Sequence, residues 1–523
     1  MENMDIMNIP KEKFRFSQKA DFSHDRKFAT KPESYLQGAF RRFRKNKGAV
    51  VGGIVIMFLI LFAIIAPFCT AYTPSYYDQV FASVRPRCSW FADSGFWDGT
   101  RMKETSYVDY LKDYAMGLET GKDVIKNGEY EVSEDGKVYT YKYDTYYGVG
   151  FGKYRTISVE EYKDIQRYQD ETGKQVLYPT VAPWDKKVAK QDEENANIYY
   201  KTKVVGGKTQ PVLTDGKIVP NYWSYKVGEM HASAAEYTST MRIEGVDGFT
   251  KDGTQYYYVY GRVVDGGVQV RADYYEYYTY LHSEVLKDGI TEPNFLFGTT
   301  SSGKDIFACL GHGARFSFIF ALVVAVVNLF VGAIYGSIAG YFGGKVDLFM
   351  ERFSEILGSV PTMIVITLLK YHMGSSSHML VLFITFFATG WIGMAATTRM
   401  QFYRFKNQEY VLAARTLGAR DRRIMFKHIF PNGLGTIVTS CALVIPSMIY
   451  SETNLSYLGI INLESGNLTS VGTLIAAGQR DILYAPYVAA FPCVFLVLLM
   501  LSFNLFGNGL RDAFNPSLRG AED

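Results

Sequence analysis

The sequence predicts an all-α polytopic membrane protein with six transmembrane helices and a large extracytoplasmic α+β insertion between helices 1 and 2. The 523 residues are 48% hydrophobic and have a mean hydropathy of −0.04, values that are typical of a soluble protein. The apolar residues, however, are gathered in separate long runs. A long polar interval, rich in tyrosine, separates the first run from the second.

The first span covers residues 48–71, which read GAVVGGIVIMFLILFAIIAPFCTA without one charged residue. About 20 apolar residues cross the hydrocarbon core as a helix. In lipid, the backbone of such a segment must satisfy its own hydrogen bonds. A cleaved signal peptide is the alternative, but residues 1–47 form a leader that is too long for one. We therefore expect an uncleaved span that follows an N-terminal tail.

Later apolar runs predict spans two to six, and in order they are 316–341, 356–369, 379–397, 436–458 and 484–506. The run at 356–369 is the weakest, because Pro361, Lys370 and His372 shorten it. Glycine and proline inside the other runs are compatible with spans, because neighbouring helices satisfy the freed backbone groups.

Basic residues in short loops predict the orientation, because cytoplasmic loops are enriched in lysine and arginine. The basic residues at the start of the first span are Arg41, Arg42, Arg44, Lys45 and Lys47. They place residues 1–47 in the cytoplasm. Six crossings return residues 517–523 to the same side, and the basic loop 399–432 is then cytoplasmic.

Residues 72–294 are expected to form a soluble domain outside the membrane. Tyrosine or valine alternates with polar residues at 137–147 and 255–264, which predicts half-buried strands. Ser158 and Glu161 have the spacing of a capping box, which predicts a helix over 158–170. The tyrosines at 256–258 and 274–278 either pack a core or form a recognition surface, since tyrosine supplies contact area at low entropic cost.

We find no catalytic or metal-binding pattern in this domain. The GGKT sequence that begins at Gly206 ends like a phosphate-binding loop, but Thr202 stands where that motif needs its first glycine. A turn is the better interpretation. His231 and His282 have no Cys or His partner at metal-ligand spacing. We therefore expect no metal, no cofactor and no enzymatic activity in this chain.

The cysteines do not predict a disulfide framework. Cys69 and Cys88 either pair on the oxidising side of the membrane or stay as thiols. Cys309, Cys441 and Cys493 lie in or beside spans, where a thiol packs as a small apolar group.

The most informative segment is EYVLAARTLGARDRRIMFKHIFPN, residues 409–432. It predicts a short helix over 409–417, a break at Gly418 and a basic amphipathic stretch up to Pro431. Such a helix–turn–helix either docks in a groove on a partner or lies on anionic lipid. Gly418 is expected to provide a close approach or a backbone angle that a Cβ would penalise.

The spacing of Ala413, Ala414, Gly418 and Pro431 resembles the EAA loop of ATP-binding-cassette (ABC) importer permeases. In that loop a glycine follows two alanines, and a proline comes thirteen residues after the glycine. The glutamate that precedes the alanines in the family is Leu412 here, and Glu409 lies three residues upstream, as in the peptide-permease branch.

The first span and residues 295–516 resemble the C-type subunit of oligopeptide, dipeptide and nickel permeases. GTTSSGKDIF at 298–307 is similar to the GTDxxGRD segment of that family, with Thr300 and Lys304 in place of Asp and Arg. AGYFGGKVD at 339–347 and FNLFGNGLRDAFNP at 503–516 also match. The insertion at 72–294 lies outside the resemblance.

The resemblance implies the ABC permease fold and the import of peptides across a bacterial plasma membrane by ATPase-driven alternating access. The implied partners are a second permease subunit, two cytoplasmic ATPases that hold ATP and Mg, and an extracytoplasmic substrate-binding lipoprotein. The residues expected to contact the ATPases are Glu409, Ala413, Ala414, Arg415, Gly418, Ala419 and Pro431.

Glu452 is the one carboxylate within span five. We expect that it either lines the translocation path or lies at the outer end of its helix, because lipid exposure of a charge is costly. The alternative function for the whole chain is that of a membrane-anchored sensor or adhesion protein, which acts through its external domain.

Overall fold

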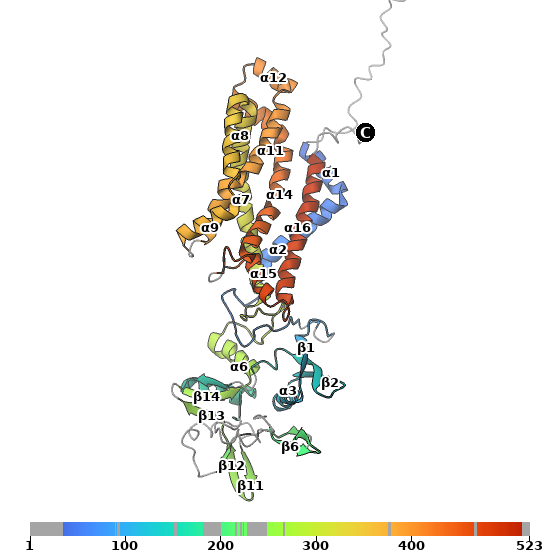
Figure 1. The fold of residues 1–523 in the computed structure, drawn as a ribbon, viewed down its shortest axis with the longest axis vertical. Coiled ribbons are helices and arrows are strands. Elements are labelled where there is room, and N and C mark those ends of the chain that lie inside the picture. Colours follow the sequence, from blue (N-terminus) through green and yellow to red (C-terminus); the bar gives the residue numbers. More distant parts are fainter. Residues whose placement is uncertain are drawn as a thin grey trace, which may run out of the picture.

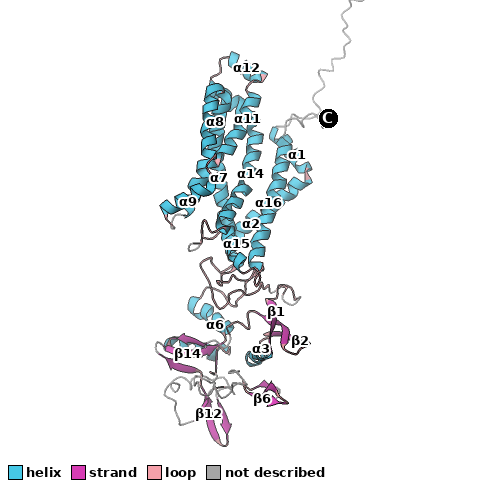
Figure 2. Ribbon diagram, in the orientation of Figure 1, coloured by secondary structure: helices cyan, strands magenta, loops and turns pink. Residues whose placement is uncertain are grey.

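The computed structural model describes residues 35–514. The internal residues that it does not describe are 89, 92–94, 151–153, 181–199, 215–216, 220–221, 223, 227–247, 265–266, 375–377 and 465–467. Figure 1 shows an elongated molecule with a helical bundle at one end and small sheets at the other. Figure 2 shows that the strands are confined to the insertion end.

Among the described residues, five helical segments are long and apolar enough to cross a membrane. They are Lys47–Phe68, Ile306–Phe342, His378–Phe405, Asp421–Tyr457 and Tyr487–Phe514. The first comprises α2 (Lys47–Ile65) and a 3-10 turn, the second is α7, and the third comprises α10 (His378–Thr389) and α11 (Trp391–Phe405). The fourth contains α14 (Phe430–Tyr457), and the fifth is α16.

The span predicted over 356–369 is not one continuous helix. These residues straddle a break between α8 (Gly344–Gly358) and α9 (Thr362–Met373), which meet at 66°. Pro361 explains the break, because it has no N–H to donate and it holds Val360 away from helical angles. Counting the bent pair as one span brings the candidates to six.

Helix α7 begins at Ile306, well before the apolar run at 316–341. Its N-cap is Asp305, whose carboxylate accepts hydrogen bonds from the backbone N–H groups of Phe307 and Ala308. The Thr70 hydroxyl, beyond the end of α2, also donates to this carboxylate. Burial nevertheless raises the pKa of Asp305 to about 7.

Three glycines at four-residue spacing let α7 and α11 approach closely: Gly332, Gly336 and Gly340. A Cβ on Gly336 would lie 2.2 Å from the Ala395 carbonyl oxygen, and one on Gly340 would lie 2.8 Å from that of Arg399. Small residues at such an interface allow extensive backbone and side-chain contact where lipid supplies no hydrophobic drive.

Helix α2 packs on α16 in a similar way. A Cβ on Gly52 would lie 2.7 Å from the Ser502 carbonyl oxygen, and one on Gly509 would lie 2.0 Å from the Ala49 side chain. The first and last spans therefore form a close pair beside the α7–α11 pair.

The insertion contains small antiparallel sheets. In the first, β1 (Thr100–Ser106), β3 (Val138–Asp144) and β2 (Ile125–Val132) pair in that order. The second has the order β13 (Gly261–Val264), β14 (Gly267–Ala272) and β4 (Tyr154–Ile157), and β5 (Leu177–Tyr178) also pairs with β14. In the third, β12 (Thr254–Tyr258) lies between β10 (Ser224–Lys226) and β11 (Gly248–Lys251).

Two hairpins complete the strands: β6 (Thr202–Val205) with β7 (Lys208–Pro211), and β8 (Leu213–Thr214) with β9 (Lys217–Ile218). Gly206 and Gly207 form the β6–β7 turn, both with positive φ, which confirms the turn predicted for GGKT. The predicted strand at 137–147 is β3. The pattern at 255–264 forms two strands, β12 and β13, instead of one.

The helices of the insertion are α3 (Tyr107–Thr120), α4 (Val159–Thr172), α6 (Tyr274–Tyr280) and a π-helical turn at Leu281–Leu286. Helix α4 confirms the prediction for 158–170, since Ser158 Oγ accepts a hydrogen bond from Glu161 N. The Glu161 carboxylate does not turn back to Ser158 to complete a capping box. It accepts a hydrogen bond from the Tyr277 hydroxyl.

The tyrosines of α6 pack a core. Tyr274, Tyr275, Tyr277 and Tyr278 are buried against Phe81, Tyr146 and β14. Tyr256 and Tyr258 on β12 are half-buried. His282 is buried as well and contacts the Tyr76 hydroxyl and Asp288. His231 lies outside the described residues, while Cys69 and Cys88 are free thiols.

Aromatic stacking fixes the base of the insertion to the bundle. The Trp97 ring lies nearly parallel to the rings of Phe297 and of Phe491 on α16, at centroid distances of 6.0 and 5.8 Å. Nearby, the backbone N–H of Asp78 donates a hydrogen bond to the Gly303 carbonyl. A Cβ added to Gly303 would lie 1.8 Å from the backbone carbonyl oxygen of Asp78. The insertion is therefore seated on the ends of α7 and α16.

We predict that Gly336→Ala destabilises the protein by about 1 to 3 kcal/mol, the usual cost of overpacking. The added methyl group can be accommodated only if α7 and α11 separate. Gly393→Ala is the matched control, because a Cβ there meets nothing within 4 Å. The stability of both variants is measured by thermal unfolding of the full chain in detergent. Equal unfolding midpoints for Gly336→Ala and Gly393→Ala would contradict the close α7–α11 contact.

Candidate coupling surface

Residues 409–432, which contain the Ala413, Ala414 and Gly418 motif, lie at the tip of the bundle that is remote from the sheets (Figure 1). Helix α11 ends at Phe405, and α12 (Glu409–Thr416) follows after a short turn. The chain then enters α13 (Asp421–Arg423) and a π-helical turn (Ile424–Ile429), which continues into α14. The tip is thus an exposed helix between two spans.

Gly418 ends α12 in a Schellman motif. The N–H of Ala419 donates to the Ala414 carbonyl and the N–H of Gly418 donates to the Arg415 carbonyl, both at 3.0 Å. Gly418 has φ +79° and nothing within 4 Å of an added Cβ. Within this chain, therefore, the glycine supplies the left-handed backbone angle and not a close approach.

One side of α12 is anchored. Val411 is buried in an apolar cluster with Ile424, Met425, Phe402 and Tyr341. The Tyr341 hydroxyl, near the end of α7, donates to Asp421 Oδ1 at 2.5 Å. The helix is therefore packed against α7, α11 and the segment that leads into α14.

The other side of α12 faces outward. Leu417 is 88% exposed, and Tyr410 and Leu412 are also exposed. Burial of part of the Tyr410 ring raises the pKa of its hydroxyl, which keeps the group neutral. These exposed apolar side chains make α12 a candidate interaction surface.

Basic residues border this apolar tip. A hollow of about 670 Å³ is formed by residues that follow α12 in the chain, and it is lined by Arg420, Arg422, Arg423, Phe426, Lys427 and Pro431. The described lining contains no acidic side chain, so an acidic partner surface is complementary to it.

The predicted coupling residues fall into two groups. Glu409, Ala413, Arg415, Gly418 and Pro431 are exposed, whereas Ala414 and Ala419 are half-buried. Glu409 lies in the first turn of α12 and Pro431 in the first turn of α14. The motif did not identify Val411, Tyr341 or Asp421, which hold the helix in place.

An ionic cluster behind the tip also escaped the sequence analysis. Arg399 on α11 donates to both carboxylate oxygens of Asp347 on α8, at 2.5 and 2.7 Å. The same guanidinium donates to both oxygens of Glu351 at 2.9 Å. Bidentate pairing of this kind fixes direction as well as distance, so the cluster joins α8 to α11.

Glu452 on α14 is fully buried. Its carboxylate accepts hydrogen bonds from the hydroxyls of Ser317 on α7 and Ser456 on α14, each at 3.0 Å. In this conformation the carboxylate faces protein and connects two helices. A direct role in substrate passage requires that these helices separate.

Two protein-family models match parts of the chain. Residues 332–520 match the family described as "Binding-protein-dependent transport system inner membrane component". Residues 34–86 match the "N-terminal TM domain of oligopeptide transport permease C". The insertion beyond residue 86 lies between the two matched regions.

Curated relatives match less than half of the chain. The oligopeptide transport system permease protein OppC of Bacillus subtilis is 41% identical over 223 residues, which are 43% of this chain and 72% of the relative. The dipeptide permease protein DppC of the same organism is 37% identical over 242 residues, 45% of this chain and 74% of the relative. OppC of Escherichia coli is 39% identical over 228 residues, covering 44% and 74%.

Among solved structures, the inward-facing MetNI methionine ABC transporter aligns with a TM-score of 0.32 and 17% identity, over 40% of this chain and 96% of the matched chain. The spans, the α12 tip and the family matches define a multi-pass membrane transport subunit. The chain belongs to the binding-protein-dependent transport system inner membrane components, in their oligopeptide and dipeptide permease C branch. It is a permease subunit of an ABC importer, a family that implies a partner permease and ATPases.

We predict that Arg399→Lys lowers the free energy of unfolding by about 1 to 2 kcal/mol, because a lysine replaces a bidentate fork with a single point charge. Arg352→Lys is the control. Arg352 is exposed and pairs only with Glu355 among the described residues, so its loss is expected to stay below about 0.5 kcal/mol. Chemical or thermal unfolding of the full chain measures the stability of both variants. An equal loss of stability in Arg399→Lys and Arg352→Lys would contradict a structural role for the ionic cluster.

Proposed function

We propose that this chain forms, with a second permease subunit, the path by which peptides enter the cell, and that cytoplasmic ATPases drive it through α12. The exposed, anchored tip at Leu417 and Gly418 is the observation that supports this most strongly. The names of the relatives, which are oligopeptide and dipeptide permeases, support peptides as the substrate class.

The proposed orientation places α12 and both termini in the cytoplasm and the insertion outside. The basic residues at the start of α2 and around α12 favour it, because such residues are retained on the cytoplasmic side. ATP and Mg belong to the partner ATPases in this proposal. An extracytoplasmic lipoprotein delivers the peptide.

The mechanism follows from the contacts of α12. An ATPase that closes on ATP pushes the tip, and the buried side at Val411 and Asp421 passes the displacement to α7, α11 and α14. ATP then shifts the equilibrium between inward-open and outward-open states, because the ATPase contacts α12 differently in each. Glu452 and its serine partners lie where α7 and α14 would have to slide.

We predict that Gly418→Asp abolishes ATP-driven peptide uptake in proteoliposomes and releases the ATPases during purification. The aspartate strains the left-handed turn and places a charge on the docking tip. The matched control is Gly459→Asp at the opposite end of α14, because Gly459 ends that helix in the same motif with φ +69° and open space.

Gly459→Asp is expected to retain the ATPases, although it carries the same local strain. Loss of the ATPases from both variants would mean that backbone strain, and not docking, explains the effect. Wild-type uptake by Gly418→Asp would contradict the proposal outright.

We also propose that the insertion docks the binding protein or gates its peptide. Its base is fixed on α7 and α16 through Trp97 and Asp78, so forces on the insertion reach the spans. Deleting all of 76–291 would remove these bracing segments too. A shorter deletion keeps them, because Thr180 N donates to the Val259 carbonyl at 2.6 Å and the two ends already meet.

We predict that replacing residues 181–258 with two glycines lowers binding-protein-dependent uptake at least about tenfold, a loss of roughly 1.4 kcal/mol of coupling. The ATPases should still co-purify with this variant, since the bundle is unchanged. Uptake at the wild-type rate, with the same dependence on binding-protein concentration, would leave the distal part of the insertion without a transport role.

A further inference from the structure

A short aromatic stretch lies where the insertion meets the last span. Residues 88–97 read CSWFADSGFW, and the structure describes all of them except 89 and 92–94. The backbone N–H of Cys88 donates to the Trp97 carbonyl at 2.8 Å, and that of Phe91 donates to the Cys88 carbonyl at 3.0 Å. Trp90 is therefore held in a turn close to Trp97.

Trp97 fastens this stretch to α16. Its ring lies nearly parallel to that of Phe491, at a centroid distance of 5.8 Å, and the Phe96 ring meets it edge-on at 5.5 Å. Trp90 is nevertheless 88% exposed, and Phe96 is 67% exposed. The one charged residue of the stretch, Asp93, lies outside the described residues. Two large exposed rings make the stretch a candidate contact surface, because aromatic rings are stabilised by leaving water.

The length of the last span places this turn at the edge of the membrane. Lys47, at the start of α2, and Arg511, near the end of α16, lie close to one level, because a Cβ on Gly509 would lie 2.0 Å from the Ala49 side chain. About 20 residues of α-helix rise about 30 Å, which is the thickness of the hydrocarbon core. Counted back from Arg511, this length ends at Phe491, on which Trp97 stacks.

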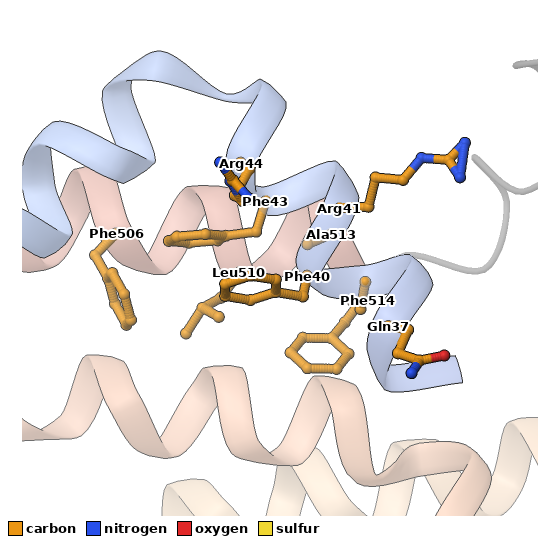
Figure 3. Close-up of a pocket in the computed structure, with 10 residues that line it drawn as sticks. Gln37, Phe40, Arg41, Phe43, Arg44, Phe506, Leu510, Ala513 and Phe514 are labelled. Atoms are coloured by element: carbon orange, nitrogen blue, oxygen red, sulfur yellow. The ribbon is translucent and has the colours of Figure 1, made fainter. Parts of the chain in front are cut away.

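The first span gives the same boundary. The ring centroids of Phe62 on α2 and Phe495 on α16 are 6.1 Å apart, so the two helices still lie side by side near this end. Phe68, which ends the first span, is 76% exposed. Figure 3 shows that aromatic rings of α1 (Tyr35–Lys45) gather at the opposite end of α16. Aromatic side chains are typical of the two membrane–water boundaries, where their apolar rings meet the ends of the acyl chains.

An exposed apolar row on α16 leads to the turn. Its members are Val494, Leu498 and Leu501, which are 56%, 40% and 55% exposed. They follow Phe491 at intervals of three and four residues, so they share its face of the helix. An exposed apolar face on a span suits acyl chains. Trp97 stacks on the end of this row, so the exposed rings of Trp90 and Phe96 continue a surface that suits lipid.

We propose that Trp90 and Phe96 insert into the membrane leaflet on the insertion side, at the level where headgroups meet acyl chains. The partner is the lipid surface itself, so no particular headgroup is required. This anchor and the Trp97–Phe491 stack hold the base of the insertion at two places and restrain its tilt relative to the membrane. The anchor is separate from the coupling surface and from Glu452.

The test is photocrosslinking of the full chain in nanodiscs of palmitoyloleoylphosphatidylcholine, with p-benzoylphenylalanine in place of Trp90. The excited probe reacts with C–H bonds of acyl chains, and intact-mass spectrometry detects the addition of one lipid. The same probe at Val497 is the positive control, because Val497 is 63% exposed within the span. The probe at Val205 is the negative control, because Val205 is 47% exposed on β6, which Figure 1 shows at the end of the insertion remote from the bundle.

The probes at Trp90 and Val497 should each gain a lipid, and the probe at Val205 should gain none. A lipid adduct at Val497 without one at Trp90, or equal yields at Trp90 and Val205, would overturn the proposal. In the assembled transporter, a crosslink from position 90 to another subunit, with no lipid adduct, would overturn it in favour of a protein contact. The assay uses neither ATP nor peptide, so its failure would leave the transport proposal standing.

Discussion

The close contact between α7 and α11 is the constraint on which the rest of the bundle depends. Gly336 brings the two helices so near that a single methyl group would meet the Ala395 backbone. In lipid, where apolar side chains gain little by leaving their surroundings, such contact supplies much of the association. Because α11 is followed by α12 after a short turn, the same contact links α12 to α7, the longest described helix.

That body extends further through polar contacts. Arg399 joins α8 to α11, and Tyr341 joins the end of α7 to the start of the α13–α14 segment. Each contact is directional, and in the proposed mechanism these contacts pass a displacement at the tip to the spans. The Glu452 hydrogen bonds lie deeper between α7 and α14. We infer that the Arg399 and Tyr341 contacts stay intact during transport, whereas the Glu452 hydrogen bonds rearrange.

Much of this organisation could be predicted from the sequence where the cause is local. Long uncharged runs can be little other than spans, and Gly418 after two alanines predicted a helix end that proved to be a Schellman turn. The break at Pro361 also has a local cause, but the apolar residues on both sides concealed it. Contacts between residues far apart in the sequence could not be predicted, and Arg399 and Asp347, for example, are 52 positions apart. Composition also left the role of the tyrosines open, because a core and a binding surface use the same residue.

The most direct test of the central claim is site-specific photocrosslinking in the assembled transporter. The account predicts that p-benzoylphenylalanine at Leu417 crosslinks to an ATPase, and that ATP changes the yield. The same probe at Leu483 is the control, since Leu483 is 86% exposed but lies between α15 (Val471–Arg480) and α16, at the insertion end of the bundle. It should give no ATPase crosslink. An ATPase crosslink from Leu483, or none from Leu417 in a complex that hydrolyses ATP, would contradict the account.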